Sequence, residues 1–209
     1  MGVSTYHQEM AQQKRSAIIE SATALFAELG YDGASLARIA AAAGVSKATL
    51  FKQFPTKAQL FEAMVTEFWT PQESADLSTP APTDDVRKGL VTLGRRYVAL
   101  LSRPGMAELF RLVIAEAPRF PELARANFEL GKQPFWASVR DYLRAEDGNG
   151  TLDVAHPDIA ATQYLGMIAD NVFWPRLLLV GWNPSRRTMH HVVDEAVETM
   201  LARYARRGG

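Results

Sequence analysis

The stretch ASLARIAAAAGVSKATLFKQFPTK, residues 34–57, decides the fold of this chain. Ser35 and Ser46 can each cap a short helix with a side-chain oxygen. Gly44 lies between these two helices and can adopt the positive φ that a tight turn requires. A proline then stops the second helix, and Thr56 can cap a third. The pattern predicts a helix-turn-helix followed by a further helix.

The same stretch contains four basic residues and no acidic one. At the start of its second helix the side chains are short and polar or basic, so the backbone could approach the major groove of DNA and Thr49 could contact a base edge. Helix N-termini attract phosphate, and Arg38 and Lys57 add positive charge nearby. The candidate DNA contacts are Ser35, Arg38, Ser46, Lys47, Thr49 and Lys57. The other interpretation is a small helical bundle whose basic face is only solvated.

Composition limits the remaining possibilities. The chain has 209 residues, 47% of them hydrophobic, and a formal net charge of zero. Any affinity for DNA must therefore come from local charge, such as the six basic against four acidic residues within 1–60. The lack of cysteine excludes disulfide scaffolds, thiolate zinc sites and cysteine nucleophiles. Neither a signal peptide nor an apolar run of membrane-spanning length is visible, so we expect a cytoplasmic protein with no membrane partner.

Helical periodicity runs through nearly the whole chain and strand signals are almost absent, which predicts an all-α protein of about nine helices. From Thr70 to Asp85, prolines are interspersed with Ser and Thr, which indicates a linker. We therefore expect a three-helix helix-turn-helix domain over 11–70 and a C-terminal helical domain over 84–207. The helices expected in the second domain cover about 84–102, 104–117, 121–146 and 157–180, with a kink at Pro175, before a last helix capped by Asn183.

Residues 12–64 resemble the N-terminal domain of TetR-family (tetracycline-repressor-like) transcriptional regulators. The matching residues are Ile18-Ile19, Ala22, Leu25-Phe26, Gly30-Tyr31, Ser35-Leu36, Ile39-Ala40, Ala43-Gly44-Val45-Ser46, Thr49-Leu50-Phe51, Phe54, Lys57 and Leu60-Phe61. The resemblance implies a homodimer in which residues 46–52 of each subunit enter the major groove of a palindromic operator, and it adds Phe51 and Lys52 to the DNA contacts. Phe51 replaces the usual tyrosine, which removes one phosphate hydrogen bond, and Ala48 and Gln53 also depart from the family pattern.

Residues 112–123, LVIAEAPRFPEL, resemble the regulatory domain of AefR-like members of the same family. This implies a helical ligand-binding and dimerisation domain but names no ligand. Aromatic and methionine side chains gather here, and they could line an apolar cavity or simply fill the core. Asp170 and Asn171 interrupt an apolar run, so one of them could be buried and orient an effector, or face solvent, or bond across a dimer seam. The candidate ligand contacts are Phe110, Phe128, Trp136, Met167, Asp170, Asn171 and Trp174.

The last predicted helix has an unbroken apolar stripe from Met189 to Tyr204. Together with the apolar run of the helix before it, this stripe is more apolar surface than one small domain needs. We therefore expect a four-helix dimer interface, formed by residues 157–180 and 186–204 of each subunit.

No catalytic or metal-binding pattern is visible. The four histidines do not pair at the spacing that places two metal ligands on one helix face, and no Gly-x-Ser-x-Gly motif is present. We expect no enzyme activity, cofactor or metal. The expected function is a DNA-binding transcriptional regulator, a repressor released from its operator by a small, largely apolar effector. The alternatives left open are an activator, and a helical small-molecule-binding protein or enzyme that keeps the N-terminal bundle as a scaffold.

Overall fold

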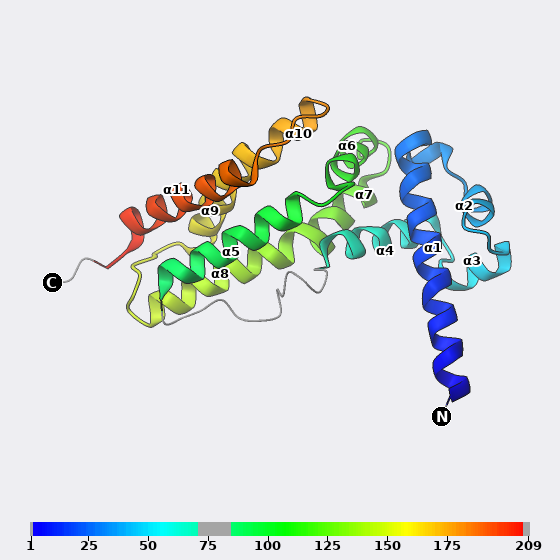
Figure 1. The fold of residues 1–209 in the computed structure, drawn as a ribbon, viewed down its shortest axis with the longest axis horizontal. Coiled ribbons are helices and arrows are strands. Elements are labelled where there is room, and N and C mark those ends of the chain that lie inside the picture. Colours follow the sequence, from blue (N-terminus) through cyan, green and yellow to red (C-terminus); the bar gives the residue numbers. More distant parts are fainter. Residues whose placement is uncertain (1, 71–84, 207–209) are drawn as a thin grey trace. The chain divides into compact units, whose positions relative to one another are not determined.

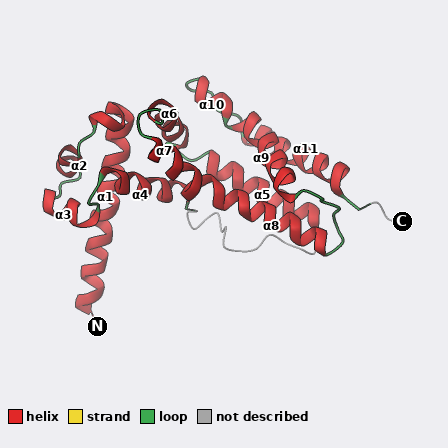
Figure 2. Ribbon diagram, turned by 180° about the vertical axis from the view of Figure 1, so that it is seen from behind, coloured by secondary structure: helices red, strands yellow, loops and turns green. Residues whose placement is uncertain are grey.

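The computed structural model describes residues 2–70 and 85–206, with side chains from Met10 onward. Within these ranges Figure 1 and Figure 2 show helices joined by short loops, and the strand-like pairing is limited to an isolated antiparallel bridge between Leu152 and Ala205. The all-α prediction is confirmed for the described residues. None of their helices combines the length and apolarity needed to cross a bilayer. The predicted linker lies almost entirely outside these ranges.

The chain folds as two compact units that differ from the predicted domains. The N-terminal unit consists of Met1–Trp69 and Glu108–Gly131, and the C-terminal unit consists of Thr70–Ala107 and Lys132–Gly209. From the sequence we expected a single division, between residues 70 and 84. Residues 108–131 instead pack with the helix-turn-helix, although they come after the linker in the chain.

The helices of the N-terminal unit are α1 (Gly2–Gly33), α2 (Leu36–Ala42), α3 (Lys47–Gln53), α4 (Lys57–Trp69), most of α6 (Met106–Glu116), α7 (Pro121–Ala126) and most of the π-helical segment η1 (Asn127–Lys132). Their core is aromatic. The ring centroids of Phe26 and Phe61 are 6.2 Å apart, and those of Tyr31 and Phe61 are 5.8 Å apart. Leu50 of α3 and Leu60 of α4 are also fully buried. The apolar side chains of these short helices can leave water only in this shared core, which holds α3 in place.

The predicted caps and turn of the helix-turn-helix are confirmed. Ser35, Ser46 and Thr56 each accept, on the side-chain oxygen, a hydrogen bond from the backbone N–H three residues later, at 3.3, 3.1 and 3.2 Å. Gly44 has a φ of 65°, and a Cβ placed on it would meet nothing within 4 Å. The turn therefore needs glycine for its backbone conformation and not for space.

The single helix predicted over 121–146 is instead divided into α7, η1 and α8 (Gln133–Gly148). The regular α-helical ladder cannot continue here because Pro134 has no amide hydrogen to donate. In the N-terminal unit, Nε1 of Trp69 donates to Oδ1 of Asn127 at 3.3 Å, and a Cβ at Gly131 would collide with the Trp69 indole. The end of α4 is therefore packed closely against η1.

The C-terminal unit contains α5 (Val86–Leu101), α8, α9 (Pro157–Val172), α10 (Trp174–Leu178) and α11 (Arg186–Tyr204). Helix α9 packs against α5, α8 and α11. In this core the hydroxyl of Tyr164 donates to the carbonyl oxygen of Leu90 at 2.7 Å. A Cβ at Gly94 would lie 2.6 Å from Cγ1 of Val193, so α5 can approach α11 this closely only with glycine at that position.

Most of the apolar stripe predicted on the last helix lies inside the subunit, and its members Met189, Val192 and Leu201 are half-buried. Its buried members are Val193, Ala196, Val197, Met200 and Tyr204 of α11. The large apolar side chains that remain exposed in the C-terminal unit lie mainly in α9, α10 and the loop after α10: Ile159, Trp174, Leu178, Leu179 and Val180.

Two predicted boundaries in this unit can be compared with the structure. The N-cap of the last helix is Ser185, whose Oγ accepts from the Thr188 N–H at 3.1 Å, so the prediction of Asn183 as the cap was wrong. The helix predicted over 157–180 is interrupted at residue 173, between α9 and α10. Pro175 explains this break, because it cannot donate to the carbonyl four residues earlier.

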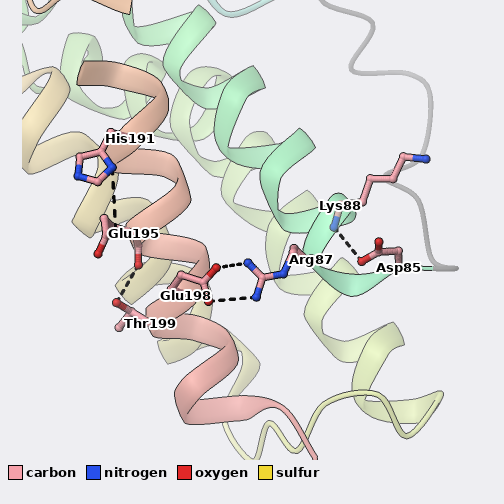
Figure 3. Close-up of polar contacts among 7 residues, drawn as sticks. All are labelled: Asp85, Arg87, Lys88, His191, Glu195, Glu198 and Thr199. Carbon is pink, nitrogen blue, oxygen red and sulfur yellow. Dashed lines mark hydrogen bonds and ion pairs between the residues drawn. The ribbon is translucent and has the colours of Figure 1, made fainter. Parts of the chain in front are cut away.

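An ion pair links α5 to α11 on the surface of the C-terminal unit. Arg87 binds both carboxylate oxygens of Glu198 (Figure 3), with 3.0 Å between Nη2 and Oε2. The hydrogen bond from Arg87 lowers the pKa of the Glu198 carboxyl. Both side chains are about half exposed, so the pair is screened by water and contributes little net stability.

Candidate nucleic-acid interface

Helix α3 is held by one fully buried side chain. Leu50 is completely shielded from solvent, and it faces a core to which α2 contributes the buried Ile39 and Ala40. The turn between the helices is tied by a hydrogen bond from the N–H of Val45 to the carbonyl oxygen of Ala40 at 3.0 Å. The Val45 side chain is only half-buried, so Leu50 is the principal anchor of the two that the sequence suggested.

Other side chains of α3 are exposed to solvent. Lys47 and Lys52 are exposed, and Phe51 retains 48% of its surface. Thr49 is half-buried, and its Oγ1 lies 2.8 Å from Oγ of Ser46. The helix therefore turns its leucine inward and its cationic end outward, which is the orientation that contact with a DNA duplex requires.

Helix α2 adds a third exposed cation. Arg38 is exposed, and so is Ser35, whose Oγ is engaged in capping the helix. Arg38, Lys47 and Lys52 are thus three exposed cations on a segment, residues 34–57, whose sequence contains no acid. A segment of this kind attracts a polyanion even though the whole chain is neutral.

Lys57 occupies a different environment from the other predicted contacts. Its Nζ donates to the carbonyl oxygens of Tyr31 at 2.7 Å and Asp32 at 3.3 Å, and it lies 4.5 Å from the centre of the Tyr31 ring. Burial lowers the pKa of Lys57, and the charges of Asp32 and Glu116 oppose this change. An ammonium has three N–H groups, so at most one remains for a phosphate oxygen.

Sequence reasoning missed two residues near this interface. The guanidinium of Arg15 in α1 lies 4.6 Å from the centre of the Phe54 ring, directly after α3. Glu116 at the end of α6 accepts a hydrogen bond from the backbone N–H of Tyr31, a residue 85 positions earlier. No local pattern could have revealed either contact, because the partners are far apart in the chain.

Comparison with known families identifies the chain. Residues 18–64 match "Bacterial regulatory proteins, tetR family", and residues 88–206, more than half of the chain, match "AefR-like transcriptional repressor, C-terminal domain". The chain belongs to the TetR family. It is therefore a DNA-binding transcriptional regulator, and TetR-family regulators are non-enzymatic. The alternative of an enzyme or a scaffolded small-molecule-binding protein finds no support.

Several known proteins are similar to this chain in sequence or in structure. An uncharacterized HTH-type transcriptional regulator of Bacillus subtilis (strain 168), YezE, is 27% identical over 147 residues, which cover 69% of this chain and 75% of YezE. A solved structure named as a TetR-family regulator, from Mesorhizobium loti MAFF303099, is 30% identical with a TM-score of 0.77 and covers 94% of this chain and 98% of its own. The flavonoid-responsive regulator FrrA is 26% identical with a TM-score of 0.75, covering 94% and 100%.

The seven predicted ligand contacts of this TetR-family chain are divided between the two units. Phe110 and Phe128 belong to the N-terminal unit, and the other five belong to the C-terminal unit. Phe128 and Trp174 retain 54% and 50% of their surface. Trp136 and Met167 are half-buried, and Nε1 of Trp136 donates to Oγ1 of Thr162 at 3.1 Å.

Asp170 and Asn171 are both exposed in the subunit, so a buried polar pair is not formed. The side-chain amide of Asn171 donates to the carbonyl oxygen of Met167 on its own helix at 2.9 Å. The apolar run around them is buried through Ile168, Ala169 and Val172, and the helical period turns the two polar residues to the other side. Of the three expectations for these residues, exposure is the one that the single subunit displays.

No metal site appears among the described side chains: they contain no cluster of three or more His, Asp or Glu residues suited to a metal ion. His156, His190 and His191 are exposed, and Nδ1 of His191 lies 4.0 Å from Oε1 of Glu195 (Figure 3). The side chain of His7 lies outside the described residues.

Proposed function

We propose that this TetR-family regulator is a cytoplasmic homodimer that represses transcription by binding a palindromic operator and is released by a small, largely apolar effector. The observation that carries the proposal is the orientation of α3, with Leu50 fully buried and both Lys47, at the start of the helix, and Lys52 exposed. Two such helices related by a two-fold axis can enter successive major grooves of one duplex face.

We propose which part of the DNA each side chain contacts from its exposure and its chemistry. Thr49 and Phe51 offer small polar and apolar groups for base edges, and Lys47 and Lys52 offer charge for phosphates or guanine. The side chains that lie at or near helix N-termini are proposed to contact phosphates of the DNA backbone: Ser35, Arg38 and Ser46. Lys57 contributes at most one hydrogen bond to DNA, because two carbonyl oxygens already bind its ammonium.

The proposed dimer interface uses α9, α10 and the outer side of α11. Most of the apolar stripe of α11 is already buried in the subunit, so the apolar surface available to a partner comes mainly from Ile159, Trp174 and Leu178. Gly166, in the middle of α9, is exposed, and a Cβ placed on it would meet nothing within 4 Å. A small residue at this position would let a second helix approach closely.

We propose that the effector binds within the C-terminal unit, near the half-buried Trp136 and Met167. The Thr162 hydroxyl, which accepts the Trp136 N–H, offers a polar group beside Trp136. The name of FrrA, a relative 26% identical to this chain, describes it as flavonoid-responsive. Flavonoids are planar and aromatic, so they are a sensible first set of compounds to test.

The experiment starts from a random-sequence duplex pool, from which the full chain selects its preferred DNA. We expect an enriched palindrome, bound with an affinity that falls steeply with salt, by a slope of roughly 0.9 per neutralised phosphate. Binding of the selected duplex is then followed by fluorescence anisotropy while individual flavonoids are added. Failure to enrich any sequence, or binding that does not depend on salt, would contradict the proposed function.

A further inference from the structure

Helix α1 contains one non-helical residue close to its C-terminal end. Gly30 has φ 71° and ψ 172°, so the helical backbone is interrupted there and Tyr31 and Asp32 follow in a changed direction. We call residues 30–32 the α1 elbow. Its conformation requires glycine, because a side chain at this φ would be strained.

The elbow faces the end of α6 on one side. Oε1 of Glu116 accepts a hydrogen bond from the backbone N–H of Tyr31 at 3.1 Å. A Cβ placed on Gly30 would lie only 2.7 Å from the same oxygen. Glycine is therefore needed here for a second reason, which is to leave room for the Glu116 carboxylate.

Two further contacts join the same elements. Nη2 of Arg119 lies 2.9 Å from Oδ2 of Asp32, but both side chains are about 60% exposed, so water screens this pair. The rings of Phe120 and Tyr31 meet edge to face, with centroids 4.9 Å apart. The Glu116 side chain is only 15% exposed and its hydrogen bond is charge-assisted, which makes it the stronger of the two polar links.

The other side of the elbow faces the helix-turn-helix. The carbonyl oxygens of Tyr31 and Asp32 both accept from the ammonium of Lys57, and this residue is the first of α4, directly after α3 and its short connection. The elbow thus offers its N–H to α6 and its carbonyl groups to α4. A change in the position of Glu116 would move the elbow and, through Lys57, the start of α4.

We propose that Glu116 is a positioning residue for DNA binding: its carboxylate fits into the space left by Gly30 and accepts the Tyr31 N–H, and this contact sets the orientation of α3 and α4 that fits the operator. The inference rests on the proposed function. The segment that carries Glu116 lies within the C-terminal family match, 88–206, yet it packs in the N-terminal unit. Glu116 therefore connects the regulatory sequence to the DNA-binding helices without contacting DNA itself.

The first test needs no DNA. Hydrogen exchange of the Tyr31 amide is measured by NMR in wild type, Glu116→Ala and Glu116→Gln. We expect the alanine variant to exchange much faster, and the glutamine variant to retain protection because its side-chain oxygen can still accept the bond. The matched control is Glu108→Ala, which removes the same residue type from an exposed position in the first turn of α6. Equal protection in wild type and Glu116→Ala would overturn the inference.

The second test compares affinities for the duplex selected by wild type and for a scrambled duplex of the same composition. For Glu116→Ala we expect the ratio of the two affinities to fall roughly tenfold, the size of one charge-assisted hydrogen bond. The salt slope should stay unchanged because no phosphate contact is lost. Glu116→Gln should restore the ratio, and a purely structural role for Glu116 would leave the ratio as it is in wild type.

A second variant disturbs the contact between Glu116 and the α1 elbow by a change in the elbow itself. Gly30→Ala places a methyl group against the Glu116 carboxylate, so we expect it to lower the affinity ratio as well. The double variant should lose clearly less than the sum of the two single losses, because both changes break the same contact. Additive losses would overturn the inference. If wild type itself selects no sequence, the proposed function fails, whereas normal selection with an unchanged ratio in Glu116→Ala defeats only the role of Glu116.

Discussion

The ammonium of Lys57 lies 2.7 Å from the carbonyl oxygen of Tyr31 and 4.5 Å from the centre of its ring. Lys57 therefore links the end of α1 to the start of α4. The side chain is partly withdrawn from water, which lowers its pKa, and the two carbonyl oxygens that it binds belong to the last turn of α1. Such carbonyls lack partners within their own helix.

This contact predicts that Lys57 stabilises the fold even without DNA. We expect Lys57→Met to lower the free energy of unfolding by about 1 kcal/mol, because the carbonyls of Tyr31 and Asp32 lose their donor. The quantity to measure is the urea midpoint of the DNA-free protein. Lys47→Ala, at an exposed position, is the control and should leave the midpoint unchanged. If the midpoint of Lys57→Met equals that of Lys47→Ala, the hydrogen bonds of Lys57 to the two carbonyl oxygens contribute nothing to stability.

Lys47, in contrast to Lys57, should affect DNA binding and not the stability of the DNA-free protein. We expect Lys47→Ala to weaken binding to the selected duplex strongly, because the side chain is exposed at the start of α3. If it contacts a phosphate, the salt slope should also fall by about 0.9. Lys88→Ala, which removes an exposed lysine from α5, is the control for a general loss of charge. An equal loss of affinity in both variants would mean that the charge of the chain matters and the position does not.

Gly166 tests the proposed dimer. It is exposed in the middle of α9, so Gly166→Ala should raise the stability of the isolated subunit by up to about 1 kcal/mol through helix propensity. If a partner helix packs there, the added methyl group should also weaken self-association, which sedimentation over a range of concentrations measures. Gly148→Ala, at the end of α8, is the control because its Cβ also meets nothing. Unchanged self-association would place the interface elsewhere.

Buried tyrosines predict a loss of stability at alkaline pH. Burial raises the pKa of Tyr31 and of Tyr97 to about 12, and it also raises that of Tyr164. Above pH ~10 the unfolded chain releases phenol protons that the folded chain keeps, so stability falls with rising pH, by up to about 1.4 kcal/mol per unit for each tyrosine. The lowered pKa of Lys57 acts in the opposite direction.

The check is urea unfolding of wild type and Tyr97→Phe between pH 8 and 11. We expect the variant to lose less stability per pH unit than wild type, because phenylalanine has no proton to lose. The ring stacked on Phe135, with centroids 5.2 Å apart, is retained in the variant. Parallel stability curves for the two proteins would show that Tyr97 titrates normally.

Local chemistry explains why the helix-turn-helix was predictable. Each cap joins a side chain to a backbone N–H three residues later, and the positive φ of Gly44 is a property of one residue. Lys47 is the first residue of α3 and is exposed, whereas Leu50 on the next turn is the buried residue of this helix. Contacts of this range are encoded within a few neighbouring residues, so the sequence displays them directly.

The C-terminal unit was harder to predict because its arrangement depends on contacts between residues far apart in the chain. The apolar stripe of α11 is real, but the sequence does not say whether its partner is the same subunit or another copy, and α5 and α9 take it up. Asp170 and Asn171 sit in an apolar run, yet they face outward, because the orientation of α9 depends on which neighbours it meets.

The amino-acid sequence by itself determined the helical class, the capped helices and glycine turn of residues 34–57, and the family whose signature they carry. Only the tertiary structure decided that residues 108–131 join the N-terminal unit, that Glu116 reaches Tyr31, and that Lys57 binds the end of α1. The physical reason is range: caps and turns are short-range hydrogen bonds, whereas these contacts join residues between 26 and 85 positions apart and form only when the whole core assembles.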